Sequence, residues 1–493
     1  MLFNSIQFFL FFPIVTLLYF IIPHRFRWLL LLAASCYFYM AFIWYFILIL
    51  VFTIVVDYYV GIGLENEKDL TKRKRLLILS IIANIGILAV FKYYNFLNQI
   101  MSDILIAIDQ KNPIPMLSLV LPIGLSFHTF QALSYTIEVY RGNIKAERHF
   151  GIYALYVMFY PQLVAGPIER PQNILHQFYT HHYFNYNDVT SGLKLMAWGL
   201  FKKMVIADRI SLVVDGIYTN PEAQSGFTCV VGTMLFAIQI YCDFSGYSDI
   251  AIGAARVMGI KLMENFKRPY HSQSVSEFWQ RWHISLSTWF RDYLYIPLGG
   301  SKVAIPHWYF NLFITFLMSG LWHGAHWNFV IWGGLNGFYL ILGLWTAPLR
   351  NKIVEITKLN RLKTVHTLLN VALTFSLICI SWVFFRATSF DNAMTILMKG
   401  FSWASILNDI GNKGIMTLIN QVFEQPNVFG GKWITFFALG ILLVVEYLQI
   451  YGSLTQRIAS YPLVIRWIIY YIFIIILFLL SDHSNRQFIY FQF

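Results

Sequence analysis

The sequence predicts an all-α, polytopic membrane protein, and three observations support this fold class. Of the 493 residues, 58% are hydrophobic and only 12% are charged, whereas a soluble domain carries roughly 25% charged residues. Apolar runs of about 20 residues, the length that crosses the hydrocarbon core of a bilayer, recur along the chain. The long apolar blocks also lack the alternation of apolar and polar residues that is typical of membrane β-strands.

We expect roughly eleven transmembrane helices, with further re-entrant or interfacial helices between them. The predicted spans lie near residues 5–23, 27–43, 44–63, 76–97, 116–139, 225–242, 305–322, 326–345, 366–386, 433–450 and 465–481. Three less apolar segments, 151–166, 188–213 and 244–259, are predicted to be short, re-entrant or interfacial. Residues 387–432 are typical of an extracytoplasmic loop with one interfacial helix. Because no internal repeat and no soluble segment interrupts this pattern, we expect a single domain over residues 1–493.

The positive charge predicts the orientation of the chain in the membrane. Its formal net charge is +12, and the basic residues gather in short loops, near residues 24–27, 68–75, 141–148 and 350–363. Short basic loops between spans mark the cytoplasmic side, and an N-terminus outside the membrane places the first three of these loops inside. Contact with anionic lipid headgroups is a sufficient use for such charges. The charge therefore gives no support for nucleic-acid binding.

A segment with unusual polarity lies between residues 239 and 300, where polar, aromatic and glycine residues mix. Within it, residues 274–296 are predicted to form one helix that ends at Pro297. Ser274 and Glu277 have the spacing of a capping box at its start. Because polar side chains occupy more than one face of this helix, it is expected to lie at the interface or to line a wet cavity.

Polar and ionisable side chains at membrane depth are costly, so they are the first candidates for a functional site. Most of them fall between residues 243 and 326, and the full set is His128, Asp243, Ser245, Asp249, His283, His323 and His326. A structural interpretation stays open for some, since the aspartates can cap or cross-link helices and His326 can bond the backbone. The concentration of these groups, among tryptophans and glycines, favours a site.

A buried histidine suits proton transfer, because burial disfavours the charged imidazolium and leaves a free base near neutral pH. Gly320 and Gly324 flank His323, and we expect them to let a substrate approach the backbone closely. A metal site is not predicted, because His323 and His326 lack a third ligand and the four cysteines show no CxxC spacing. The phosphate-binding and nucleophile-elbow motifs of nucleotide-binding proteins and α/β-hydrolases are also missing.

The chain resembles the membrane-bound O-acyltransferase family, most closely its bacterial branch of alginate, peptidoglycan and cellulose O-acetylation proteins. The resemblance rests on six passages in order along the chain, LPIGLSFHTFQALSYTIEVYRG (121–142), FYPQLVAGPIERP (159–171), YCDFSGYSDIAIG (241–253), FWQRWHISLSTWFRDYLYIPLGG (278–300), GLWHGAHWNFVIWGGLNG (320–337) and FIYFQF (488–493). It implies a bundle of helices around a central tunnel, with the polar catalytic region near residues 239–337. It also implies that His323 is the active-site histidine and that His283 is the second catalytic position.

The resemblance further implies the reaction and its partners. The expected donor is acetyl-CoA, which binds as a substrate from the cytoplasm, and no bound cofactor or metal is expected. The expected acceptor is a cell-surface or exported polysaccharide, reached through a separate extracytoplasmic or membrane-anchored acetyltransferase partner. The expected location is the inner (cytoplasmic) membrane of a bacterial cell, in contact with membrane lipid.

We expect His323 to act as general base on an acceptor hydroxyl, while His283 orients the acyl group or donates to the developing oxyanion. A covalent acyl-histidine intermediate is an open alternative. Substrate-binding candidates from the same motifs are Trp322, Asp243, Ser245, Arg281, Asp292, Asn336 and His128. Positive charge for the donor phosphates is expected at the cytoplasmic mouth, from Lys202, Lys203, Arg209, Lys267 and Arg268, although these side chains would serve equally well as lipid contacts.

Three other functions compete with this prediction. D-alanyl transfer to teichoic acid is the main rival within the enzyme class, because it uses a carrier-protein thioester in place of acetyl-CoA. A transporter would be expected to show two related halves with broken helices, which the sequence lacks. A scaffold of a polysaccharide export complex would not explain the histidine cluster.

Overall fold

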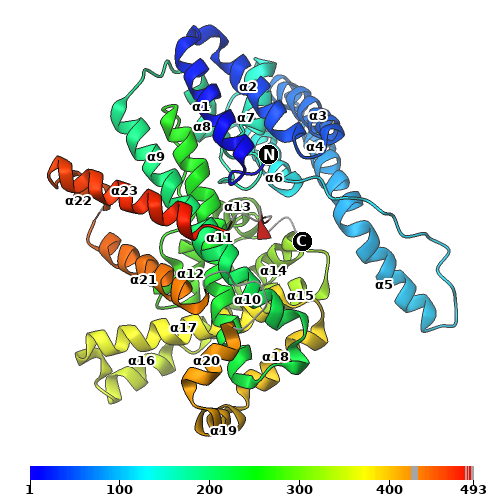
Figure 1. Ribbon diagram of the computed structural model, residues 1–493. Helices are drawn as coiled ribbons and strands as arrows, with labels where there is room; N and C mark the ends of the chain where they lie inside the picture. The colour runs from blue at the N-terminus through cyan, green and yellow to red at the C-terminus, as the bar shows by residue number, and fades with distance from the viewer. Residues whose placement is uncertain (424–430, 453, 483–485, 487, 490–493) are drawn as a thin grey trace. The chain divides into compact units, whose positions relative to one another are not determined.

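The computed structural model describes residues 1–423, 431–452, 454–482, 486 and 488–489. Every secondary-structure element in this described part is a helix (Figure 1), which confirms the predicted all-α class. The chain separates into two compact units, and each is described by itself. Unit 1 contains residues 1–196 and 247–264, and unit 2 contains residues 197–246 and the described residues from 265 onward. One functional domain over residues 1–493 stays a prediction.

Unit 1 is built from the N-terminal helices, drawn in blue and cyan in Figure 1. Its elements are α1 (Ile6–Ile21), α2 (His24–Met40), η1 (Trp44–Phe46), α3 (Ile47–Asn66), α4 (Leu70–Leu88), η2 (Ala89–Tyr93), α5 (Tyr94–Ile106), α6 (Leu125–Tyr140), α7 (Phe150–Met158) and α8 (Pro171–Tyr179). Two helices, α9 (Tyr186–Leu200) and α11 (Gly226–Val257), have residues in both units.

A buried carboxylate links two of the helices in unit 1. Asp57 of α3 is fully buried, and it accepts hydrogen bonds from Ser80 Oγ at 2.6 Å and from Asn84 Nδ2 at 2.8 Å. Both donors lie on α4, so the carboxylate is satisfied within the hairpin of α3 and α4. A buried charged group is tolerated when hydrogen bonds replace its water shell.

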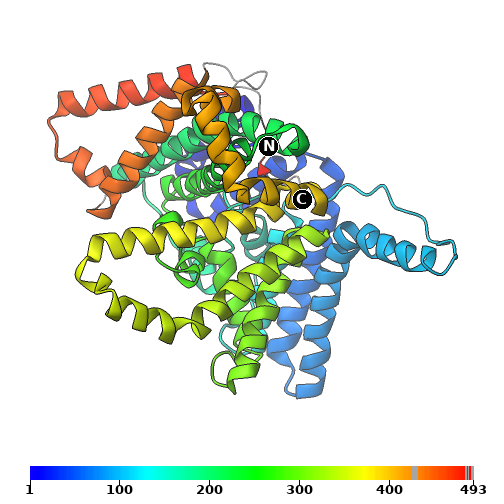
Figure 2. The same ribbon diagram turned by 90° about the horizontal axis from the view of Figure 1, so that it is seen from below.

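Unit 2 contains the remaining elements. They are η3 (Phe201–Ala207), α10 (Asp208–Thr219), η4 (Pro221–Ala223), η5 (Pro269–His271), α12 (Val275–Arg281), α13 (Ile284–Phe290), η6 (Arg291–Tyr295), α14 (Ile305–His323), α15 (Trp327–Trp345), α16 (Ala347–Ile356), η7 (Leu359–Arg361), α17 (Lys363–Arg386), α18 (Phe390–Phe401), α19 (Trp403–Lys413), α20 (Ile415–Phe423), α21 (Gly431–Ile450), α22 (Leu454–Ala459) and α23 (Leu463–Leu480). Figure 2 follows these helices from below, in green, yellow and red.

Seven helices in the described part of the chain are long and apolar enough to cross a membrane, and α1 is a shorter apolar helix. The seven are Trp44–Asn66, Leu70–Ile106, Gly226–Val257, Trp327–Trp345, Lys363–Arg386, Gly431–Ile450 and Leu463–Leu480. This supports a multi-pass membrane protein. The stretch predicted as a loop with one interfacial helix, residues 387–432, instead holds three short helices, α18, α19 and α20.

Helices α14 and α15 pack closely against each other in unit 2, and glycines allow it. A Cβ atom placed on Gly320 would lie 3.1 Å from the Cα atom of Gly333, and it would also collide with the carbonyl oxygen of Phe329. The two backbones therefore touch where both residues lack a side chain. This crossing fixes the end of α14, which carries His323, against the start of α15.

Candidate active site

The predicted helix over residues 274–296 is wrong in one respect, because the structure divides it. Ser274 begins α12 as predicted, with its Oγ accepting a hydrogen bond from the backbone N–H of Glu277 at 3.1 Å. The helix then ends at Arg281, and His283 adopts a left-handed conformation with φ 43° and ψ 56°. A second helix, α13, begins at Ile284. The sequence gives no local signal for this break, since His283 is neither glycine nor proline.

The break has its cause in a segment that is distant in the sequence. Backbone hydrogen bonds join residues 265–267 to the turn, from Lys267 N to Arg281 O at 2.9 Å and from Ile284 N to Asn265 O at 2.9 Å. These bonds satisfy backbone groups that a continuous helix would have satisfied internally. The chain between α11 and η5 thus stabilises the turn that presents His283.

His283 is buried, with 1% of its surface exposed. Its imidazole meets the ring of Phe244 edge to face, with centroids 4.5 Å apart, and lies 6.3 Å from the ring of Trp322. Burial lowers the pKa of His283 to about 3. The residue lies outside the seven helices that are long and apolar enough to cross a membrane, and its burial favours the neutral imidazole.

His323 is the last residue of α14 and is also buried. Aromatic rings from three helices surround it, with centroids at 4.8 Å for Trp322, 4.9 Å for Trp332 and 5.3 Å for Phe385. Trp322 is therefore in ring contact with both histidines. These rings restrict the orientation of the imidazole and keep bulk water from it.

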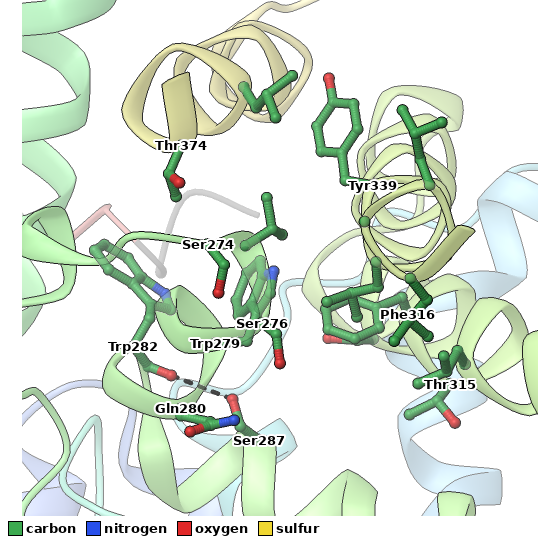
Figure 3. Close-up of a pocket in the computed structure, with 18 of the residues that line it drawn as sticks. Ser274, Ser276, Trp279, Gln280, Trp282, Ser287, Thr315, Phe316, Tyr339 and Thr374 are labelled. Carbon is green, nitrogen blue, oxygen red and sulfur yellow. Dashed lines mark hydrogen bonds between the residues drawn. The ribbon is translucent and has the colours of Figure 1, made fainter. Parts of the chain in front are cut away.

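The two histidines line one cavity of about 1060 Å³ in unit 2. Its walls come from α12, α13, α14, α15 and α17, and Figure 3 shows Trp279, Trp282, Phe316, Tyr339 and Thr374 around it. Pockets for small molecules have volumes of roughly 300–1,000 Å³, so this cavity has room for a large substrate. Both histidines were predicted to share such a wall. Their catalytic roles stay predictions.

The charges on the cavity wall have one sign. Arg291 of η6 and Arg350 of α16 line it, and the lining within the described residues contains neither aspartate nor glutamate. Arg291 is paired with Asp292 at 2.7 Å, and Arg350 donates to the carbonyl oxygen of Gly343 at 2.7 Å. The sequence did not single out these two arginines as donor contacts, because basic residues at helix ends and in short loops resemble headgroup contacts.

One tryptophan that lines the cavity has a buried indole N–H without a hydrogen-bond partner among the described residues. The indole nitrogens of Trp279, Trp332 and Trp382 are buried and have no hydrogen-bond partner among the described residues. Of these, Trp279 lines the cavity, and Figure 3 labels it there. Most buried indole N–H groups have a partner, so a substrate oxygen is a candidate partner for Trp279.

Four of the predicted substrate-binding residues of unit 2 have partners within the protein. The carboxylate of Asp243 lies 2.6 Å from Nζ of Lys203 and accepts a hydrogen bond from Ile489 N at 2.7 Å. Ser245 accepts a hydrogen bond from Nζ of Lys202 at 2.8 Å. Arg281 is paired with Glu277, and Asp292 is paired with Arg291.

None of these four residues, nor Trp322 or Asn336, is among the residues that line the cavity in the described part of the chain. Trp322 is in ring contact with both histidines, although it does not itself line the cavity. Asn336 is fully buried and donates to the carbonyl oxygen of Trp332 at 2.8 Å. Their substrate-binding roles stay predictions.

The basic residues expected at a cytoplasmic mouth are also absent from the lining within the described chain. Lys203 is buried between two carboxylates, with Nζ at 2.7 Å from Asp208 and 2.6 Å from Asp243. Arg209 donates to the carbonyl oxygen of Leu480 at 2.8 Å. The lysine of this buried ion cluster therefore neutralises protein charge.

The expectation that Gly320 and Gly324 leave room for a substrate is wrong. A Cβ atom on Gly324 would collide with the ring of Phe329, and the space beside Gly320 is filled by α15. These glycines serve helix packing. His326 also has a structural partner, since its Nδ1 accepts a hydrogen bond from Asn328 N at 3.2 Å and so begins α15.

His128 belongs to unit 1. It is buried on α6, and its Nε2 lies 3.0 Å from the carbonyl oxygen of Leu163. Asp249, on the part of α11 that belongs to unit 1, is half-buried. In the terminal passage FIYFQF, only Phe488 and Ile489 lie within the described residues.

The comparisons with known proteins agree with the resemblance. The model of the membrane-bound O-acyltransferase family (MBOAT) matches residues 16–390. The chain is 38% identical over 411 residues to the probable alginate O-acetylase AlgI of Pseudomonas aeruginosa, with 82% of this chain and 76% of that protein covered. It is 34% identical over 440 residues to the peptidoglycan O-acetyltransferase of Helicobacter pylori, with 82% and 81% covered. It is 26% identical over 291 residues to the teichoic acid D-alanyltransferase of Bacillus subtilis, with 55% and 70% covered.

Proposed function

The chain belongs to the membrane-bound O-acyltransferase family and is a multi-pass membrane O-acyltransferase, and on that premise we propose that it moves acetyl groups from a cytoplasmic thioester donor towards an exported polysaccharide. The observation that carries this proposal is that His283 and His323 line one large cavity. The names of the relatives at 34–39% identity, alginate O-acetylase and peptidoglycan O-acetyltransferase, support an acetyl group and a glycan acceptor.

In the proposed reaction His323 removes the proton from an acceptor hydroxyl, and the hydroxyl oxygen forms a bond to the thioester carbonyl carbon. The carbon–sulfur bond then breaks, and the departing thiolate takes the proton from His323. The products are an ester and a free thiol. A positioned base contributes about 10²–10⁴-fold to such a step, and the ring contacts from Trp322, Trp332 and Phe385 keep the imidazole in place.

The negative charge that develops on the carbonyl oxygen needs a donor. Trp279 lines the cavity, and its indole N–H, which is buried and has no partner among the described residues, is the donor that we assign to this role. A donor held in place before the reaction stabilises an oxyanion without reorganising. Removing one such donor from an enzyme costs about 10²–10³-fold in rate.

The charged residues that line the cavity favour one acyl donor over another. Arg291 and Arg350 suit the phosphates of acetyl-CoA, because guanidinium groups match phosphate geometry. A D-alanyl group carries an ammonium ion, which is best stabilised by a carboxylate, and the lining within the described residues has none. This supports an uncharged acetyl group over a D-alanyl group.

We place the protein in the inner membrane of a bacterial cell, with a second protein on the outer face that completes transfer to the polymer. The proposal is tested by measuring ester-linked acetyl groups on the exported polysaccharide of cells with the wild-type chain, without the chain, and with His323→Ala. Loss of acetyl groups in the second and third cells is expected. Unchanged acetylation without the chain contradicts the proposal.

A further inference from the structure

The side chain of Asn265 contacts the turn around His283 at three polar atoms. It is buried, with 1% of its surface exposed. Its Oδ1 lies 3.1 Å from Ser285 N, 2.9 Å from Ser285 Oγ and 3.1 Å from His283 Nδ1. His283 itself gives no side-chain cap to α13, so Asn265 takes that role from 18 residues away.

These contacts show which atom of the Asn265 side-chain amide is the oxygen and which is the nitrogen. A backbone N–H can only donate, so the side-chain atom of Asn265 that faces Ser285 N must be the oxygen and not the nitrogen. An amide oxygen can only accept. The Nδ1 atom of a neutral His283 that faces the same oxygen must therefore carry the proton, which leaves the lone pair on Nε2.

This tautomer limits what His283 can do. Its single N–H is directed at Asn265, so the neutral ring has no second N–H for a developing oxyanion. In this tautomer a neutral His283 would orient a reactant and would not donate to the oxyanion. Its Nε2 is a hydrogen-bond acceptor, suited to a hydroxyl or thiol hydrogen of a reactant.

We infer that Asn265 is a positioning residue, which holds His283 in the Nδ1–H tautomer and in its left-handed turn so that Nε2 accepts a hydrogen bond from a reactant in the cavity. This inference rests on the proposed catalytic role of His283. Asn265 lies outside the cavity lining, and its place in the sequence gives no indication of this function.

The rings of Phe244, Phe266 and Trp322 lie beside the imidazole, and Ser285 Oγ lies 3.5 Å from its Nδ1. None of these groups is charged. The nearest charged side chain along the turn is Arg281, which is paired with Glu277. On α11, Asp243 is adjacent to Phe244 and is bound to Lys203 and Ile489 N. An amide at position 265 therefore keeps the immediate surroundings of His283 neutral.

The most informative variant is Asn265→Asp, because it preserves the acceptor and adds a negative charge. A carboxylate beside an imidazole favours the imidazolium form, and such a pair shifts a pKa by about 1–3 units. A protonated His283 has no lone pair on Nε2. The variant should therefore lose activity as the pH falls and regain it as the pH rises.

The test measures transfer of radiolabelled acetyl groups from acetyl-CoA in membrane vesicles that contain the full chain, from about pH 4 to about pH 9. Asn265→Asp should move the acidic half-point of the rate upward by about one pH unit or more. Asn265→Ala should lower the rate at least about 10-fold at every pH, since it removes both the tautomer control and the cap. Transfer with Asn265→Asp that follows the wild-type pH profile in a folded protein overturns the inference.

A matched control is Asn311→Ala. Asn311 is another fully buried amide of unit 2, whose Nδ2 donates to Leu298 O at 3.1 Å and Gly300 O at 3.0 Å. It should lower the thermal midpoint without moving the pH profile. His283→Asn, measured in parallel, separates the two proposals, because a wild-type rate in that variant contradicts the catalytic role of His283 itself.

Discussion

The imidazole of His323 meets the indole of Trp332 edge to face, with ring centroids 4.9 Å apart and ring planes at 85°. Trp332 stacks in turn on Trp382, 5.8 Å away and at 20°. A histidine held in this way has a fixed direction, which a general base needs and a lipid-facing side chain would not have. The aromatic cluster thus joins the packing of α14, α15 and α17 to the proposed chemistry.

His323→Ala should abolish acetyl transfer, with a loss of at least ~100-fold by the usual contribution of a general base. The measurement is acetyl transfer in membrane vesicles, at equal amounts of inserted protein. Near wild-type transfer in this variant would remove His323 from the mechanism.

The control for His323 is His326→Ala, three residues further on. Its Nδ1 begins α15 by accepting from Asn328 N, and loss of a helix cap costs about 1 kcal/mol. This variant should therefore melt at a lower temperature while its transfer rate stays within a few-fold of wild type.

His283→Asn is a sharper test of the second histidine than His283→Ala. His283 has a φ of 43°, a conformation in which a residue other than glycine, asparagine or aspartate costs roughly 1–2 kcal/mol. Asparagine tolerates this backbone, so the variant should keep its thermal midpoint while transfer falls at least about 10-fold. An equal loss of stability and rate would make His283 a structural residue.

The sequence predicted both histidines because a titratable side chain at membrane depth is conspicuous in an apolar chain. It also predicted the start of α12, because Ser274 and Glu277 are only three residues apart. It did not predict the break at His283, because the bonds that cause it come from Asn265 and Lys267. Local patterns therefore located the site, and long-range hydrogen bonds determined its shape.

Long-range contacts also explain why the role of the basic residues could not be predicted from the sequence. Lys203 carries the sequence signature of a headgroup or phosphate contact, yet Asp208 and Asp243 surround it. Asp208 is five residues away on the next helix, whereas Asp243 is forty residues away on α11. Only the packed structure brings these three charges together.

Lys203→Met should destabilise the protein strongly. It leaves two buried carboxylates without their shared cation, and breaking such a buried pair costs about 3–5 kcal/mol. The expected result is a large fall in thermal midpoint and in the amount of inserted protein. The double variant Lys203→Met with Asp208→Asn should recover part of the loss, and equal midpoints for the single and double variants would contradict the ion cluster.

Acetylation of the polymer should require a second protein on the outer face. A cytoplasmic donor and an exported glycan lie on opposite sides of about 30 Å of hydrocarbon, and the sequence contains no soluble domain that could present a polymer to a buried histidine. The measurement is acetylation of the polysaccharide by the purified chain in liposomes with acetyl-CoA. Efficient O-acetylation of the polymer by this chain alone would contradict the prediction.

The last prediction separates the effect of an indole N–H on rate from its effect on stability. The N–H of Trp279 is buried without a partner among the described residues, and such a group costs the folded state about 1–3 kcal/mol. Trp279→Phe removes the donor and keeps an aromatic ring against Trp332 and Phe316.

The matched control is Trp382→Phe. The N–H of Trp382 is also without a partner among the described residues, but Trp382 is not part of the cavity lining. Each variant relieves an unsatisfied donor but also removes buried ring volume, so the two variants should have similar thermal midpoints. Only Trp279→Phe should slow acetyl transfer, by about 10²-fold if its N–H binds the oxyanion. Equal transfer rates in the two variants would show that the indole of Trp279 is a packing residue, and that the oxyanion has another donor.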